Sequence, residues 1–220
     1  MMEKLGNWLD DRFGWRSVNE AIFLRKIPHV NWFYTLGSAT LFVAMIQAVT
    51  GILLTLYYVP TPDHAFDSVM YITTQLPGGW LIRGLHHWGA SAMVILTVLH
   101  LLRVFFYGAY KFPREATWIT GVFLLIIVIG FGFTGYLLPW DQKAYWATTV
   151  GTRIIGVAPF IGDWLLRVAR GGDNLSAVTL ARFFGTHVWV LPASLFGLLF
   201  VHLYLIIRIG ISAVPEKKED

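Results

Sequence analysis

Charged residues are missing from four long stretches of the chain. No Asp, Glu, Lys or Arg occurs at 27–62, 84–102, 116–140 or 183–207. A helix needs about 20 consecutive apolar residues to cross the hydrocarbon core of a bilayer, and each stretch meets about this length. The pattern therefore predicts an all-α membrane protein with four membrane-spanning helices, near residues 33–57, 81–107, 117–137 and 183–208.

The segments outside these stretches are polar or amphipathic. In residues 1–26, apolar side chains such as Leu5 and Trp8 recur near helical spacing beside charged ones, which predicts an amphipathic helix on the membrane surface. Residues 27–212 form the predicted four-helix domain, and residues 213–220 form a charged tail. The stretch 154–164 is too short to span the membrane and is predicted to be a single interfacial helix.

Composition and charge agree with this class. Of the 220 residues, 56% are hydrophobic and 14% are charged, whereas soluble domains carry about 25% charged residues. The net charge of +4 comes from cations scattered between apolar runs, which indicates membrane orientation and no binding of nucleic acid. Loop 59–80 has no Lys or Arg, so both termini and the connection near 108–116 are predicted on the cytoplasmic side.

Histidines supply the candidate chemistry. An ionisable side chain at membrane depth is costly and therefore indicates function. His86 and His100 are fourteen positions apart, and His187 and His202 are fifteen apart. At about 100° per helical residue, the two members of each pair differ by only about −40° and about +60° in direction. Each helix thus presents two imidazoles on broadly one face, about 21 Å apart along the axis.

In the predicted topology the second and fourth helices run in the same direction. His86 then faces His187 at one depth, called here the outer level, and His100 faces His202 at another, called the inner level. Two such pairs are suited to two b-type haems with bis-His ligation, in a haem-binding four-helix bundle. A lone histidine could instead donate a hydrogen bond between helices, and zinc fits poorly because the chain has no cysteine.

Glycines and arginines support the same reading. Gly37 and Gly51 in the first helix are fourteen apart, as are Gly121 and Gly135 in the third. Glycine permits the close backbone approach that a flat macrocycle needs from the helices that supply no ligand. Three cations lie near the ligands and could pair with haem propionates: Arg83, Arg103 and, as a weaker candidate, Arg114.

Several longer motifs resemble cytochrome b of quinol-oxidising bc complexes. The resemblance covers roughly residues 29–212, and the length and four spans are similar to the short split form, cytochrome b6 of b6f complexes and its menaquinol-oxidising relatives. The motifs are HHWGASAMVILTVLH (86–100), KFPREATWITG (111–121), GFTGYLLPWDQKAYWA (132–147), ARFFGTHVWVLP (181–192) and VHLYLIIR (201–208).

The resemblance implies specific roles. His86 and His187 would hold a low-potential haem b, and His100 and His202 a high-potential one, with the four glycines and Arg83 and Arg103 at matching positions. The segment 132–145 would line a quinol-oxidation pocket, with Tyr136 and Trp140 as candidates. At the position of the b6-type cysteine this chain has Thr35, so no covalent haem c is expected.

The resemblance also implies partners and a location. The family's Pro-Glu-Trp-Tyr (PEWY) motif is absent from this sequence, so a separate subunit-IV-like chain would supply it. A Rieske iron–sulfur protein and a c-type cytochrome would accept electrons. The whole would be a dimeric complex surrounded by lipid in the bacterial cytoplasmic membrane, where it oxidises quinol on the outer side and reduces quinone on the inner side.

Two alternatives remain open at the level of sequence. One is a dihaem membrane anchor of another oxidoreductase, of the hydrogenase or formate dehydrogenase type. Such an anchor would lack the LPWDQ segment (138–142) and the matched glycines. The other is a transporter that uses histidines as proton relays, which would bind no haem.

Overall fold

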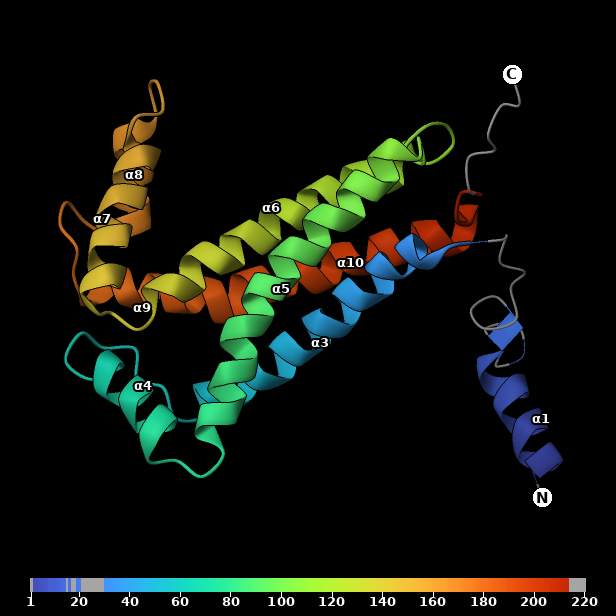
Figure 1. Ribbon diagram of the computed structural model, residues 1–220, viewed down its shortest axis with the longest axis horizontal. Coiled ribbons are helices and arrows are strands. Elements are labelled where there is room, and N and C mark those ends of the chain that lie inside the picture. The colour runs from blue at the N-terminus through green and yellow to red at the C-terminus, as the bar shows by residue number, and fades with distance from the viewer. Residues whose placement is uncertain (1, 15, 17–18, 21–29, 214–220) are drawn as a thin grey trace.

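The computed structural model describes residues 2–14, 16, 19–20 and 30–213, and every regular element in these residues is helical. Figure 1 shows a bundle of long helices with shorter ones gathered at one end. In chain order the elements are α1 (Met2–Phe13), the 3₁₀ turn η1 (Trp32–Thr35), α3 (Leu36–Thr55), α4 (Ala65–Thr74), α5 (Gly79–Phe106), α6 (Glu115–Leu137), α7 (Gln142–Gly156), α8 (Gly162–Arg170), α9 (Ala177–Gly185), the π-helical turn η2 (Thr186–Val190) and α10 (Leu191–Ile209).

The four predicted spans are confirmed. Four helical segments are long and apolar enough to cross a membrane: Trp32–Thr55, Gly79–Phe106, Glu115–Leu137 and Ala177–Ile209. At most 11% of the residues in their most apolar windows are buried inside the protein. Their apolar side chains therefore face outward, as the surface of a lipid-facing bundle does. The last segment begins before residue 183 because α9 continues through η2 into α10.

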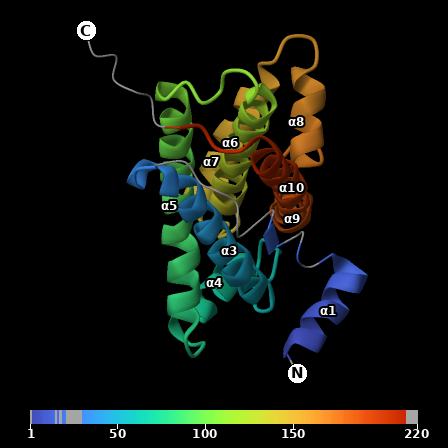
Figure 2. The ribbon, with the colours of Figure 1, turned by 90° about the vertical axis from the view of Figure 1, so that its right-hand side faces the viewer.

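The long helices form two packed pairs. α3 packs against α5, α10 packs against α6, and the pairs meet where α5 contacts α6. Viewed from the end in Figure 2, α5 and α10 stand on opposite sides, with α3 and α6 between them. α5 and α10 both begin at the end of the bundle that holds α4, α7 and α8 (Figure 1), so they run parallel as the predicted topology requires.

The connections at that end contain more helix than the sequence predicted. The 59–78 connection contains α4, which the sequence analysis did not identify. The prediction of one interfacial helix over 154–164 is wrong, since this stretch covers the end of α7, a break and the start of α8. Pro159 lies in the break, and the backbone of Gly162 packs directly on the carbonyl of Gly156, which leaves no space for a side chain there.

The first predicted segment is partly described. Helix α1 covers residues 2–13 and lies apart from the bundle in Figure 1, with Leu5 and Trp8 exposed. Of the remaining residues in 1–26, many lie outside the described part of the chain. The predicted tail at 213–220 lies outside it except for residue 213. The amphipathic surface helix therefore stays a prediction for this segment as a whole.

A compact apolar cluster occupies the middle of the bundle. Its buried members are Leu124 and Val128 on α6 and Leu195 on α10, with Met93 and Val94 of α5 packed against them. Along their helices these residues lie between the paired histidines and glycines. The buried cluster therefore lies between the outer level and the inner level.

Candidate functional site

Each of the four histidines faces one of the four predicted glycines across the bundle. A Cβ placed on Gly135 would lie 2.7 Å from Cε1 of His187, and one on Gly51 would lie 3.2 Å from Cε1 of His86. At the inner level the matching distances are 3.0 Å from Gly37 to His100 and 3.4 Å from Gly121 to His202. α3 thus supports the two rings of α5, and α6 supports the ring of His187 in η2 and the ring of His202 in α10.

The outer pair has a geometry suited to a shared metal. The ring centres of His86 and His187 are 6.3 Å apart, and the ring planes are inclined by 75°. An imidazole nitrogen binds a metal at about 2 Å, and the ring centre lies about 1 Å beyond it, so two rings on one metal have centres about 6 Å apart. The observed separation fits bis-His ligation of one iron.

Threonine hydroxyls anchor three of the four rings. Oγ1 of Thr50 lies 2.9 Å from Nδ1 of His86, and Oγ1 of Thr134 lies 2.9 Å from Nδ1 of His187. At the inner level, Oγ1 of Thr120 lies 2.8 Å from Nδ1 of His202. Each of these threonines directly precedes one of the supporting glycines, in the Thr-Gly pairs 50–51, 120–121 and 134–135.

The backbone fixes the direction of these hydrogen bonds. Each threonine hydroxyl donates its single proton to a carbonyl of its own helix: Thr50 to Ile46 at 2.6 Å, Thr134 to Gly130 at 2.8 Å and Thr120 to Thr117 at 2.9 Å. Its oxygen therefore accepts from Nδ1–H of the facing histidine. With the proton on Nδ1, Nε2 carries the free lone pair that a metal requires.

His100 differs from the other three histidines. Its Nδ1 is buried and has no hydrogen-bond partner among the described residues. The residue before Gly37 is Leu36, which has no hydroxyl, and Ser38 donates instead to the carbonyl of Thr35. The ring still faces its glycine, Gly37, and its pairing with His202 around one metal stays a prediction.

A π-helical turn explains the unequal spacing of the histidine pairs. His187 lies in η2, where the N–H of Leu191 donates to the carbonyl five residues back, at Thr186. Pro192 follows and has no N–H to continue the regular pattern. Since such a turn holds one residue more than an α-helical turn, it takes up the fifteenth residue and brings His187 and His202 onto one face.

Arg103 is a partly buried cation that could pair with the carboxylate of a cofactor. Its guanidinium lies over the ring of Tyr34 at 4.5 Å, beside the inner level. Its Nε is buried without a hydrogen-bond partner in the described part of the chain. A charged group in this position is costly unless an acceptor completes its bonding, which a haem propionate would do.

The other predicted residues occupy different surroundings. Arg83 is half-buried one turn before His86, and Tyr136 is exposed. Trp140, in the segment after α6, has a φ of 51° and contacts Tyr145 edge-on. Arg114 donates to the carbonyls of Gly210 at 3.1 Å and Ile211 at 3.4 Å, so it secures the end of α10. Their roles toward a cofactor or quinol stay predictions.

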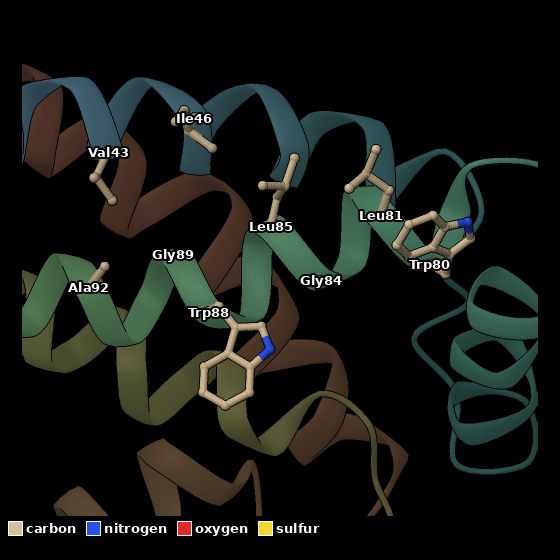
Figure 3. Close-up of a pocket in the computed structure, with 9 residues that line it drawn as sticks. All are labelled: Val43, Ile46, Trp80, Leu81, Gly84, Leu85, Trp88, Gly89 and Ala92. Carbon is tan, nitrogen blue, oxygen red and sulfur yellow. The ribbon is translucent and has the colours of Figure 1, made fainter.

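An open groove lies beside the site and does not contain the paired histidines. It has a volume of about 650 Å³ and is lined by apolar residues of α3 and α5, among them Val43, Leu85 and Trp88. In Figure 3 Trp88 points away from α3 and the lining is carbon-rich throughout. Trp88 is 73% exposed, so this groove belongs to the outward-facing apolar surface of the bundle.

The donor set restricts the chemistry of the site. Among the described residues there is no group of three or more His, Asp or Glu side chains that could enclose a metal ion. An imidazole pair at each level would instead suit the iron of a haem, which would supply one-electron redox chemistry when two histidines hold it. The arrangement favours electron transfer between two depths of the membrane.

Comparisons with known proteins agree with this arrangement. Residues 22–210 match the family model Cytochrome b/b6/petB. The chain is 43% identical to cytochrome b6 of Synechococcus elongatus and 44% identical to the menaquinol:cytochrome c reductase cytochrome b subunit of Bacillus subtilis (strain 168). Each of these matches covers 96% of this chain and 99% of the relative. A chain of a hyperthermophilic respiratory Complex III superposes with a TM-score of 0.86 at 34% identity; the match covers 97% of this chain and 58% of that one.

Proposed function

The chain belongs to the cytochrome b/b6 family, and from this premise we propose that it is the dihaem subunit of a quinol-oxidising bc-type complex. One observation carries the proposal. Four imidazoles at two depths each face a glycine, and three of them are held by threonines with Nε2 free. The relatives of this chain include a cytochrome b6 and the cytochrome b subunit of a menaquinol:cytochrome c reductase.

His86 and His187 would hold the outer haem b, and His100 and His202 the inner one. When bound, the two haems would supply one-electron redox centres at two depths of the membrane. The chain's own contribution is to fix the histidine rings through Thr50, Thr134 and Thr120 and to keep space for those rings at the four glycines. Arg103 offers a buried cation for a propionate.

The two levels are placed to carry charge across the membrane. Fourteen helical residues rise about 21 Å, which is most of the hydrocarbon layer of about 30 Å. The apolar cluster around Leu124, Val128 and Leu195 lies between the levels. Each elementary charge moved against 100 mV of membrane potential stores about 2.3 kcal/mol, so directed electron transfer between the levels conserves energy.

The outer end would provide part of the quinol pocket. Tyr136 lies in the last turn of α6 and Trp140 just after it, and α7 and α9 both contact α6. Tyr58 donates to the carbonyl of Leu138 at 2.6 Å and so secures this segment. A subunit-IV-like chain with the PEWY motif would complete the pocket. A Rieske iron–sulfur protein would take one electron and pass it to a c-type cytochrome.

The expected setting follows from charge and family. The cations of the chain ends and of the 111–114 connection favour a cytoplasmic position for these segments, in what would be a bacterial inner membrane. The complex would be dimeric and would reduce quinone at the inner level, near Arg103.

Purification of the membrane complex tests the proposal. We expect a pyridine extract to yield two protohaem per chain, a reduced-minus-oxidised spectrum to titrate in two steps, and a Rieske protein to copurify. Recovery of a hydrogenase or formate dehydrogenase subunit in place of the Rieske protein would contradict the assignment to a bc-type complex. A complex without Soret absorbance would contradict the dihaem assignment itself.

A further inference from the structure

The two levels differ in how their histidines are hydrogen-bonded. At the outer level both rings donate from Nδ1 to a threonine, His86 to Thr50 and His187 to Thr134. At the inner level His202 donates to Thr120, whereas Nδ1 of His100 has no partner in the described part of the chain. The outer level thus has two such bonds and the inner level has one.

The sequence shows why the fourth bond is missing. The supporting threonine occupies the position before the glycine in three of the four cases. Leu36 is the counterpart at the fourth, since it precedes Gly37 and stands fourteen residues before Thr50, the same interval that separates Thr120 from Thr134. A leucine at this position offers no acceptor to His100.

When Nδ1–H of a histidine donates a hydrogen bond, the same ring binds a metal more strongly through Nε2. Donation from Nδ1–H increases the electron density at Nε2 and makes the imidazole a more basic ligand. A more basic ligand stabilises the more positive, oxidised state of a bound iron and so lowers its reduction potential. A level with two such bonds is therefore harder to reduce than a level with one, when other surroundings are equal.

We propose that Thr50 and Thr134, together with the leucine at position 36, are positioning residues that set the outer level at a lower reduction potential than the inner level. The chain thereby determines the direction of electron transfer, from His86 and His187 toward His100 and His202. This inference rests on the proposed dihaem function and assigns the potential difference to three identified side chains.

Leu36→Thr is the most direct test, because it adds the missing hydroxyl rather than removing a contact. A neutral hydrogen bond corresponds to about a threefold to tenfold change in an equilibrium, which is about 30 to 60 mV for a one-electron couple at about 59 mV per tenfold. We expect Leu36→Thr to lower the midpoint potential of the inner step by this amount and to leave the outer step unchanged. Thr50→Val should raise the outer step by a similar amount.

Two further variants separate this effect from general disturbance of the fold. Thr50→Ser keeps the hydroxyl and should restore the wild-type potential. Thr40→Val is a matched control on the same helix, since the hydroxyl of Thr40 donates to the carbonyl of Leu36 at 2.8 Å and makes no hydrogen bond to a histidine in the described part of the chain; it should shift neither step. The potentials are measured by optical redox titration of the purified complex, and haem content is measured on the same samples.

The outcomes distinguish the inference from the function on which it rests. Two haem steps that stay unchanged in both Leu36→Thr and Thr50→Val would overturn the inference and leave the dihaem function standing. An equal shift in Thr50→Val and Thr50→Ser would also overturn it, because both would then reflect packing. Absence of haem from the wild-type complex would overturn the proposed function.

Discussion

A methyl group added at Gly135 is the sharpest perturbation of the site. The Cβ of Gly135→Ala would lie 2.7 Å from Cε1 of His187, whereas carbon atoms in ordinary contact are about 3.5 to 4.0 Å apart. The ring would have to retreat by about 1 Å. The hydrogen bond from Nδ1 to Thr134, the residue before this glycine, is 2.9 Å long and opposes that movement.

The four glycines give a graded series. Forcing an extra methyl group into a packed site costs about 1 to 3 kcal/mol, which is about a fivefold to 150-fold loss in the population of the required geometry. Gly135→Ala should lie near the upper end. Gly121→Ala, whose Cβ would be 3.4 Å from His202, is an ordinary contact and should be tolerated.

Haem retention measures this effect. We expect Gly135→Ala to lose the outer haem, seen as loss of one redox step and of up to half the pyridine-extractable haem, while the inner step is kept. Gly132→Ala is the matched control, because it lies on the same helix and its Cβ would meet no atom within 4 Å. Full haem in Gly135→Ala, or greater loss in Gly121→Ala than in Gly135→Ala, would refute the reasoning.

Three further predictions concern the frame around the site. Arg114→Ala removes donors to the carbonyls after α10 and should cost about 0.5 to 1.5 kcal/mol, measured as a lower thermal midpoint; an unchanged midpoint would show that these bonds contribute nothing. Burial raises the pKa of Tyr58 above its ordinary value of 10.0, so the folded state holds the phenol proton more tightly than the unfolded state, and stability should fall as pH rises above 10. This fall should be smaller in Tyr58→Phe, and equal slopes in the two proteins would contradict it. Because the chain has no cysteine, all haem should leave it in a denaturing gel; haem stain that stays with the band would contradict non-covalent binding.

Much of the site could be predicted from spacing alone. The intervals of fourteen and fifteen residues predicted that His86 matches His187 in depth and that His100 matches His202, and the structure gives each of the four a facing glycine. The four spans follow from the charge-free stretches, since a bilayer imposes nearly the same length on every crossing. The supporting threonines were missed, although the repeated Thr-Gly pairs at 50–51, 120–121 and 134–135 are visible in the sequence.

Other features depend on contacts that spacing does not encode. The π-helical turn at His187 arises where Pro192 interrupts the regular hydrogen bonds of a helix that is otherwise continuous. Arg114 binds carbonyls almost a hundred residues away, a pairing that becomes visible once α6 and α10 lie side by side. The separation of α7 from α8 depends on the close packing of Gly162 on Gly156, and a count of apolar residues over 154–164 does not reveal it.

The pairing of the histidines is tested most directly by optical redox titration of four single variants of the complex, His86→Ala, His187→Ala, His100→Ala and His202→Ala. We expect His86→Ala and His187→Ala to lose the same low-potential step of the titration. His100→Ala and His202→Ala should both lose the high-potential step. Loss of one common step in both His86→Ala and His100→Ala, or two intact steps in any of the four, would contradict this pairing.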